Sequence, residues 1–261
     1  MKRTKIDIDV NTYPDVFRPF FAGAEIYDSS CSPEARVIFI DKDRGYYLKS
    51  AERGTLKREA EMTAFFHSKG LGTEVLEYLS GDRDWMLTER VVGEDCTHPQ
   101  YTEDPKRLCD LLATLLRELH ETDFDGCPMP DRTAEYLATA ERNYKNGIYD
   151  ASLFPDNWGY ASAEDAWRVI AECGHLLKTD TLLHGDYCLP NIMLNDWKFS
   201  KFIDVDHGGV GDRHIDLFWG AWSLFFNLKT DEDRERFFDA YGRDVFEPEM
   251  LRVIAAAEVF G

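Results

Sequence analysis

The apolar pattern of this 261-residue chain changes near residue 93, and that change limits the possible folds more than any other feature. Upstream of it, short runs rich in β-branched and aromatic residues occur in pairs that flank turn-forming residues. The paired runs are 36–41 with 45–50, joined through KDRG, and 74–80 with 85–92, joined through GDRD. We therefore expect two antiparallel hairpins in the first third of the chain.

One helix is expected between these hairpins, over residues 55–70. Thr55 is suited to cap its start, and Gly70 is suited to end it. The residues expected on its buried face are Leu56, Ala60, Met62, Thr63, Ala64 and Phe66. The first third of the chain thus predicts a small antiparallel sheet that carries one helix.

Downstream of residue 93 the pattern is helical. Leucines at 108, 111, 112, 115, 116 and 119 follow the spacing of one helix face, after a start at Asp104-Pro105. Further helices are expected over 161–178, 214–228, 231–241 and 247–260. The expected fold is α+β and bilobal: residues 1–92 form a small antiparallel β-sheet lobe with one helix, and residues 93–261 form a larger, mainly α-helical lobe.

One strand-like stretch interrupts the helical half and carries the candidate chemistry. NIMLN and KFSKFID alternate around a tight Asp-Trp turn, which predicts a hairpin that begins at Asn191 and ends at Asp204. The hairpin brings its two ends together, and their amide and carboxylate oxygens suit Mg²⁺. Asp186, after His184 and Gly185, stays outside this pair and is placed to accept the proton of an attacking hydroxyl. Acidic groups at the boundary of two lobes suggest a cleft enzyme.

The composition limits the classes of molecule that the protein is expected to bind. A hydrophobic content of 44% with 30% charged residues is typical of a folded, soluble protein. The formal charge of −19, from 49 acidic and 30 basic residues, argues against nucleic acid and favours a small cationic partner. The chain has no apolar run of about 20 residues and no signal-like start, so we expect a cytoplasmic protein without membrane contact. Its six cysteines form no C-x-x-C pair, which favours reduced thiols.

The segments HGDYCLPN and FIDVDHGGVGDRHIDL together resemble the aminoglycoside phosphotransferases, and the resemblance extends over nearly the whole chain. YYLKS, REAEM, LLRELHETDFDGCP and AEVF occur in the order and at the spacing of the aminoglycoside 3'-phosphotransferase branch. The resemblance implies a protein-kinase-like fold and an ATP-binding or GTP-binding kinase. Such an enzyme transfers the γ-phosphoryl group to an aminoglycoside hydroxyl with Mg²⁺, and so confers antibiotic resistance.

The resemblance also implies roles for individual residues. Asp186 matches the catalytic base, and Asn191 and Asp204 match the magnesium ligands. Lys49 matches the lysine that holds the α- and β-phosphates, and Glu59 matches its ion-pair partner. The remaining nucleotide contacts fall on Ser32, in a phosphate-covering loop, and on the backbone of a hinge from Glu89 to Val91.

The acceptor site is expected to be acidic, since an aminoglycoside carries several ammonium groups. The resemblance places this role on Asp156, Glu258 and Phe260, and an interpretation of the two acids as ordinary surface residues stays open. The chain departs from the family pattern at Gly159, Ala257 and Gly261, and VDHGG replaces Gly-Arg-Ser-Gly after the metal aspartate. These departures concern the acceptor more than the chemistry.

Other interpretations accompany this one. Loop geometry is the expected role of His184, and hydrogen bonds from the catalytic loop are expected at Asp212 and Asp216, while His120 is expected to be a core histidine. Asp206 is either a residue behind the metal ligands or a solvated acid. Three alternative functions remain: a kinase of the same fold for another small alcohol, a non-catalytic nucleotide-binding protein, and a di-metal phosphohydrolase. The last would use His207, His214, Asp212 and Asp216.

Overall fold

A computed structural model of the chain describes residues 3–31, 33–153 and 159–261. The chain forms two compact units. Unit 1 comprises Met1–Cys96 and Pro190–Asp206, and unit 2 comprises Thr97–Leu189 and His207–Gly261. The sequence placed a boundary between residues 92 and 93. Unit 1 also includes the 190–206 segment, so the hairpin expected within the helical half belongs to the unit that contains the N-terminal sheet.

Unit 1 is built on a six-stranded antiparallel sheet with the strand order β1-β2-β3-β4-β6-β5. Its elements are β1 (Thr4–Lys5), α1 (Arg18–Phe21), β2 (Glu25–Asp28), β3 (Ala35–Asp41), β4 (Tyr46–Glu52), α2 (Lys57–Ser68), β5 (Val75–Ser80) and β6 (Arg83–Glu89). The pairs β3–β4 and β5–β6 confirm the two predicted hairpins. The two hairpins belong to one continuous sheet, because β4 also pairs with β6.

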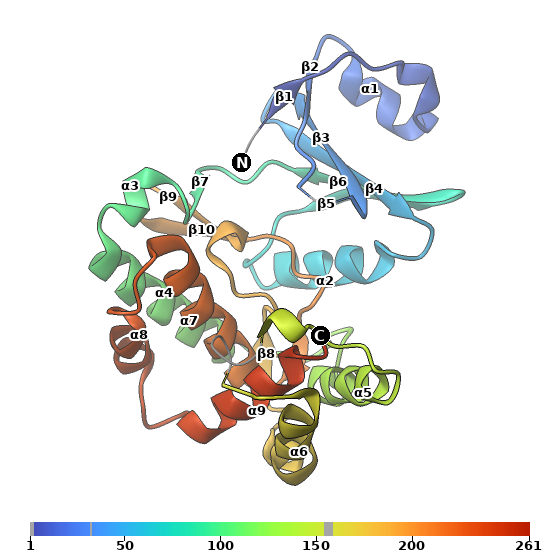
Figure 1. The fold of residues 1–261 in the computed structure, drawn as a ribbon. Coiled ribbons are helices and arrows are strands. Elements are labelled where there is room, and N and C mark those ends of the chain that lie inside the picture. The colour runs from blue at the N-terminus through green and yellow to red at the C-terminus, as the bar shows by residue number, and fades with distance from the viewer. Residues whose placement is uncertain (1–2, 32, 154–158) are drawn as a thin grey trace. The chain divides into compact units, whose positions relative to one another are not determined.

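The two faces of this sheet are covered by different segments, as Figure 1 shows for α1 and α2. Phe17 and Phe21, at α1, pack with Ile38, Leu48 and other apolar side chains of one face. On the opposite face, α2 packs through Leu56 and Ala60 against strand residues such as Ala51 and Met86. Because side chains alternate along a strand, Lys49 shares this second face with Ala51 and therefore points toward the α2 side.

The predicted helix between the hairpins is confirmed as α2, with two corrections. Leu56 is its N-cap and makes no capping hydrogen bond, whereas the Thr55 hydroxyl donates to the carbonyl of Glu52 and so closes the preceding turn. Ala64 is exposed, and Glu59 is buried instead. A carboxylate on the apolar face of a helix is costly unless it is paired, so Glu59 requires a partner.

A second sheet in unit 1 carries the predicted hairpin. It has the order β10-β9-β7, formed by β7 (Glu94–Asp95), β9 (Ile192–Asn195) and β10 (Lys198–Phe202). The turn residues Asp196 and Trp197 both adopt positive φ, 49° and 63°, which is the geometry of a two-residue hairpin turn. Gly93 precedes β7 with φ of 107°, and a Cβ there would lie 2.0 Å from the carbonyl oxygen of Leu194. The close approach of β7 to β9 thus requires glycine.

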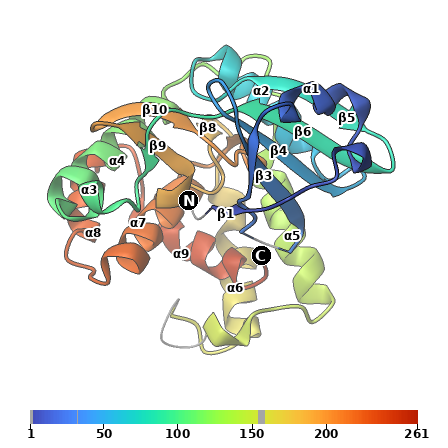
Figure 2. The ribbon, with the colours of Figure 1, turned by 90° about the horizontal axis from the view of Figure 1, so that it is seen from above.

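Unit 2 is mainly helical. Its elements are α3 (Pro99–Thr102), α4 (Pro105–His120), α5 (Arg132–Lys145), α6 (Ala163–Cys173), β8 (Thr181–Leu183), β11 (Gly209–Gly211), α7 (His214–Leu228), α8 (Arg234–Tyr241) and α9 (Pro248–Glu258). The leucine pattern is confirmed as α4, and the Asp104 side chain accepts from the Arg107 N–H as its cap. Helices α4, α7 and α8 pack together, as both ribbon views show (Figures 1 and 2). No helix in the described ranges is long and apolar enough to cross a membrane.

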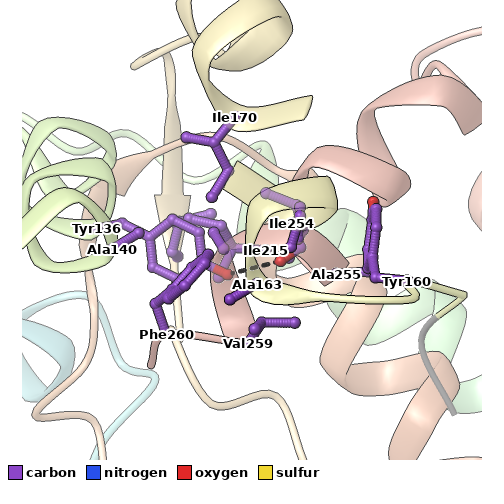
Figure 3. Packing of buried hydrophobic residues seen from close by; sticks show 14 residues of the cluster. Tyr136, Ala140, Tyr160, Ala163, Ile170, Ile215, Ile254, Ala255, Val259 and Phe260 are labelled. Atoms are coloured by element: carbon purple, nitrogen blue, oxygen red, sulfur yellow. Dashed lines mark hydrogen bonds between the residues drawn. The ribbon is translucent and has the colours of Figure 1, made fainter. Parts of the chain in front are cut away.

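One hydrophobic cluster of unit 2 gathers around α5, α6 and α9 (Figure 3). Tyr136 of α5 donates from its hydroxyl to the Ile254 carbonyl at 3.2 Å, and Phe260 is only 1% exposed among the surrounding apolar side chains. Helix α5 was not among the helices that we expected from the sequence, although Tyr136, Ala140 and Tyr144 recur at helical spacing; its buried residues are Thr133, Tyr136 and Ala140. Hydrogen bonds to residues more than 100 positions away in the chain help to fix its position.

Candidate active site

A cavity of about 930 Å³ lies in unit 1 on the α2 side of the six-stranded sheet. Its wall is formed by β3, β4 and β6, by α2, by residues 88–95, and by the segment around the β9–β10 hairpin. This volume lies in the range of pockets that bind cofactors and drug-sized ligands. Its wall includes four of the residues that the sequence predicted for nucleotide binding: Lys49, Glu59, Glu89 and Val91.

Lys49 is the charged centre of this wall. Its Nζ lies 2.9 Å and 2.8 Å from the two carboxylate oxygens of Glu59, and 3.0 Å from Oδ1 of Asp204. The partners come from three elements, since Lys49 is on β4, Glu59 is on α2, and Asp204 follows β10. Glu59 is only 5% exposed, so Lys49 supplies the partner that this buried carboxylate requires.

The charges of this cluster are coupled through burial. Burial by itself would lower the pKa of Lys49, but the carboxylates of Asp204 and Glu59 outweigh it and raise that pKa, so the ammonium is retained. Burial raises the pKa of Glu59 to about 7, against the opposing effect of Lys49. The cluster therefore presents a permanent cation, held by one buried and one solvent-facing carboxylate, at the wall of the cavity.

The open end of the β9–β10 hairpin brings the backbone segments that carry the two expected metal ligands, Asn191 and Asp204, next to each other. Phe202 is opposite Ile192, and the Ile203 N–H donates to the Asn191 carbonyl at 3.0 Å. Asp204 follows with φ of 56°, a left-handed conformation that turns the chain out of the strand. The hairpin thus places Asn191 next to the residue that precedes Asp204, as the sequence predicted.

These residues fit a hard divalent cation. Asn191 contributes an amide and Asp204 a carboxylate, both of which are oxygen donors that Mg²⁺ prefers. The Asp204 side chain is 55% exposed and borders the cavity, which leaves room for water and ligand oxygens. Asp206, whose role the sequence left open, also lines the cavity.

Asp186 lies in unit 2, in the loop that follows β8. The backbone N–H groups of His184 and Gly185 both donate to the Asp216 carboxylate at 2.7 Å, and the Asp186 N–H donates to Nδ1 of His184 at 3.3 Å. Gly185 has φ of 83°, and a Cβ there would meet the His207 carbonyl oxygen at 2.0 Å. The predicted structural role of His184 and the predicted role of Asp216 are both confirmed: together they fix the backbone that carries Asp186.

Asp212 behaves differently from the prediction. Its carboxylate accepts hydrogen bonds from the Lys178 N–H and from His214, and neither donor belongs to the loop that carries Asp186. The reason is its position before α7, where it bonds the start of that helix and the end of the segment leading to β8. His214 in turn accepts from the Glu247 N–H through Nε2. These internal bonds occupy Asp212 and His214, two of the four side chains that the di-metal interpretation needs.

His120 is confirmed as a satisfied core histidine. Its Nδ1 lies 2.8 Å from the Tyr241 hydroxyl, and its Nε2 lies 3.2 Å from the Asp216 carboxylate. Burial lowers the pKa of His120 although Asp216 opposes this, so the ring is neutral at pH 7. It supports the same Asp216 that bonds the loop before Asp186.

Of the residues expected at the acceptor site, the structure describes Glu258 and Phe260. Asp156 lies outside the described residues, as does Ser32 of the expected phosphate-covering loop. Glu258, at the end of α9, accepts from the Tyr136 hydroxyl at 2.6 Å and from Trp219 Nε1 at 3.0 Å, both through Oε1. Burial raises the pKa of Glu258 to about 7 although both hydrogen bonds oppose it. Phe260 packs in the core of unit 2.

The hinge residues Glu89 and Val91 are on the cavity wall, but part of the backbone there is occupied. The Glu89 N–H donates to Glu74 and the Arg90 N–H donates to Gly45, both within unit 1. Tyr47 and Ala51, which were not among the predicted site residues, also line the cavity. Alternation along β4 would have found them, since both lie two positions from Lys49 and share its face.

Lys49 lies on a sheet strand and is paired with a glutamate of the following helix and with an aspartate that follows a hairpin. This arrangement is typical of protein-kinase-like enzymes. The model of the Phosphotransferase enzyme family (APH) matches residues 32–254. The chain is 50% identical over 259 residues to the "Probable aminoglycoside 3'-phosphotransferase" of Lactococcus lactis subsp. lactis (strain IL1403), with 98% of both proteins covered. It is 29% identical over 251 residues to the "Streptomycin 3''-kinase" of Streptomyces griseus, covering 89% of this chain and 91% of that one.

Comparison with solved structures indicates the same family. The crystal structure of an aminoglycoside-3'-phosphotransferase of type VIII superimposes with a TM-score of 0.74 and 25% sequence identity, covering 96% of each chain. An aminoglycoside phosphotransferase from Streptomyces rimosus has the same fold, with a TM-score of 0.73. The chain therefore belongs to the aminoglycoside phosphotransferase family, whose members transfer phosphoryl groups to alcohol acceptors.

Proposed function

We propose that this enzyme transfers the γ-phosphoryl group of ATP or GTP to a hydroxyl of an aminoglycoside, and that this inactivates the antibiotic. Family membership and the name of the relative with 50% identity support the acceptor class. The observation that carries the proposal is the Lys49 ammonium, held between Glu59 and Asp204 on the wall of a nucleotide-sized cavity. A fixed cation next to a carboxylate that can hold a metal is the arrangement that triphosphate chemistry needs.

The nucleotide is proposed to bind in the cavity of unit 1. Lys49 binds the α- and β-phosphate oxygens, and Glu59 keeps its ammonium in place. The backbone of Val91 contacts the base, since the neighbouring N–H groups of Glu89 and Arg90 already donate elsewhere. Ser32 belongs to the loop that covers the phosphates. Asn191 and Asp204 hold Mg²⁺, which when bound neutralises charge on the phosphate oxygens.

The proposed reaction needs one proton acceptor. The acceptor hydroxyl oxygen forms a bond to the γ-phosphorus as the bond from that phosphorus to the β–γ bridging oxygen breaks, and the nucleoside diphosphate leaves. Asp186 orients the hydroxyl and takes its proton. The loop around Asp186 suits this task because Asp216 and His184 hold its backbone through three hydrogen bonds.

The acceptor is proposed to bind in unit 2, where acidic groups attract its ammonium groups. Glu258 and Asp156 are the proposed acids, and Phe260 shapes the site from the core side. The net charge of −19 raises the local concentration of a polycation around the whole chain. Glu258 has a raised pKa, so an ammonium group that binds beside it also stabilises its ionised form.

An acceptor panel tests this function. The purified enzyme is assayed for nucleoside diphosphate release with ATP and with GTP against a kanamycin-type compound, streptomycin, a macrolide, choline and a simple sugar. Turnover is expected with the kanamycin-type compound, and the phosphorylated hydroxyl is then assigned by ³¹P and ¹H NMR. Activity confined to another alcohol would replace the acceptor and keep the kinase. Tight nucleotide binding without turnover of any acceptor would favour a non-catalytic protein.

A further inference from the structure

The start of α2 lacks a cap of its own. Its N-cap residue is Leu56, which has no side-chain oxygen and makes no capping hydrogen bond. The helix nevertheless carries Glu59 in its first turn, so its start must be fixed if the carboxylate is to meet Lys49. The orphan N–H groups at a helix start need acceptors from elsewhere in the fold.

Asp84, on the neighbouring strand β6, supplies that acceptor. Its Oδ2 accepts from the backbone N–H of Gly54 at 2.9 Å and from that of Leu56 at 3.0 Å. The hydroxyls of Tyr78 and Ser80, on β5, donate to the same carboxylate at 3.0 Å and 2.6 Å. Asp84 is 0% exposed, so a buried carboxylate binds four donors, two of them in the segment that connects β4 to α2.

These four bonds determine the charge of Asp84. Burial would raise its pKa, but the hydrogen bonds from Ser80, Gly54, Leu56 and Tyr78 outweigh burial and lower it. The carboxylate is therefore ionised at pH 7, and charge-assisted hydrogen bonds of this kind are stronger than neutral ones. A purely apolar contact at this position would hold the connecting segment less firmly.

The position of Asp84 couples both members of the ion pair. It lies opposite Ala51 in the β4–β6 register, and Lys49 lies opposite Met86 in the same register, so β6 fixes the strand that carries the lysine. The side chain of Asp84 then fixes the first residues before α2, which carries the glutamate. One residue thus joins the end of the Lys49 strand to the start of the Glu59 helix.

We propose that Asp84 is a positioning residue that sets the separation of Lys49 and Glu59, and through it the affinity for the nucleotide. The second half of this inference rests on the proposed function, because it takes the Lys49–Glu59 pair as the nucleotide anchor. Asp84 itself does not line the cavity. It acts on the start of α2 through the backbone N–H groups of Gly54 and Leu56.

Asp84→Asn tests the proposal, because an amide keeps the size of the side chain and places an N–H₂ donor in a site built from donors. The first readout is the rate at which Lys49 is labelled by an amine-directed reagent, measured by peptide mass spectrometry. A looser pair lowers the protection of the amine, so labelling is expected to rise roughly 3- to 10-fold, the factor that corresponds to the loss of a helix cap. Unchanged labelling overturns the proposal.

The second readout is a double-mutant cycle with Glu59→Gln, in which the Kd of a fluorescent ATP analogue is measured by titration. Each single variant is expected to raise Kd, and Asp84→Asn is expected to add little in the Glu59→Gln background, because both changes disrupt one contact. Fully additive effects mean that Asp84 acts by some other route and overturn the proposal. If labelling rises but the Kd values of all variants equal that of the wild type, the nucleotide-anchor role in the proposed function fails instead.

Two further variants separate positioning from general destabilisation. Ile38→Val, in the core on the far face of the sheet, is expected to lower the melting temperature without a change in Lys49 labelling or in Kd. If Asp84→Asn does not fold, the double variant Tyr78→Phe, Ser80→Ala replaces it, since it removes the two hydroxyls that orient the carboxylate. That variant is expected to raise the rate of Lys49 labelling about 2- to 3-fold, which corresponds to roughly half the free-energy change expected for Asp84→Asn. A labelling rate equal to that of Ile38→Val overturns the proposal.

Discussion

Replacing Glu258 by glutamine should make the protein less sensitive to pH. The carboxylate is partly buried at the end of α9, and its Oε1 accepts from both the Tyr136 hydroxyl and Trp219 Nε1. A glutamine carbonyl oxygen accepts the same two bonds, so the substitution removes the charge and keeps the contacts. Burial raises the pKa of Glu258 to about 7, from an ordinary value of 4.5.

The size of the effect follows from these two pKa values. Between pH 4.5 and 7 the folded state keeps a proton on Glu258 that the unfolded state has lost, so stability falls as the pH rises. The contribution of this group is largest below the unfolded pKa and is lost as the pH passes through the folded pKa. Linkage gives a loss of about 2.5 kcal/mol in the free energy of unfolding between pH 5 and pH 8.

Urea unfolding at pH 5, 6, 7 and 8 measures this loss. The wild type minus Glu258→Gln difference isolates Glu258, because Glu59, whose pKa burial also raises to about 7, is present in both proteins and cancels. Relative to the wild type, the variant is expected to gain about 2.5 kcal/mol over this range. Glu249→Gln, in the exposed first turn of the same helix, is the matched control for the loss of a helix carboxylate. A difference for Glu258→Gln that is equal at pH 5 and pH 8 would refute the argument.

Three further predictions concern the site and its supports. Asp186→Asn should lower kcat by about 10² to 10⁴ with an unchanged Kd for the nucleotide, as measured by single-turnover assay and by titration, and unaltered turnover would remove Asp186 as the base. Lys49→Met should raise the nucleotide Kd about tenfold or more, since it removes the cation and leaves Glu59 buried without it; an unchanged Kd would place the nucleotide elsewhere. Gly93→Ala should destabilise unit 1 by about 2 to 4 kcal/mol in thermal or urea unfolding, because its Cβ would lie 2.0 Å from a β9 carbonyl oxygen. Gly54→Ala, with φ of 89° and no neighbour within 4 Å, should cost only about 1 kcal/mol, and equal losses would contradict the steric argument.

Part of the site follows from the sequence because its signals are local. Alternating apolar residues predicted the hairpin that carries Lys49, and the Asp-Trp turn predicted the hairpin from Asn191 to Asp204. The order of HGD, Asn191 and Asp204 then carried the family resemblance. Each of these signals spans fewer than about 25 residues, and strand alternation and turn conformation depend mainly on neighbours in the chain.

Other features had weak or misleading local signals. Helix α5 buries only Thr133, Tyr136 and Ala140, so its apolar face is narrow and gives a weaker signal than the leucine face of α4. Thr55 has the side chain of a helix cap, but its hydroxyl bonds backward to Glu52, and the cap of α2 comes from Asp84 in another strand. Local propensity was overridden there by a long-range hydrogen bond, which sequence spacing does not encode.

The sequence by itself determined the hairpins β3–β4, β5–β6 and β9–β10 and helices such as α2 and α4, and it determined which acidic and basic side chains the chain offers for phosphoryl transfer. The tertiary structure decided how those side chains are charged and supported. In the sequence, Glu59 and Glu258 are both glutamates of predicted helices. In the structure, Glu59 is paired with Lys49, whereas Glu258 accepts hydrogen bonds from a tyrosine and a tryptophan. Their environments depend on desolvation and on partners far along the chain, and these exist only once the core has closed around them.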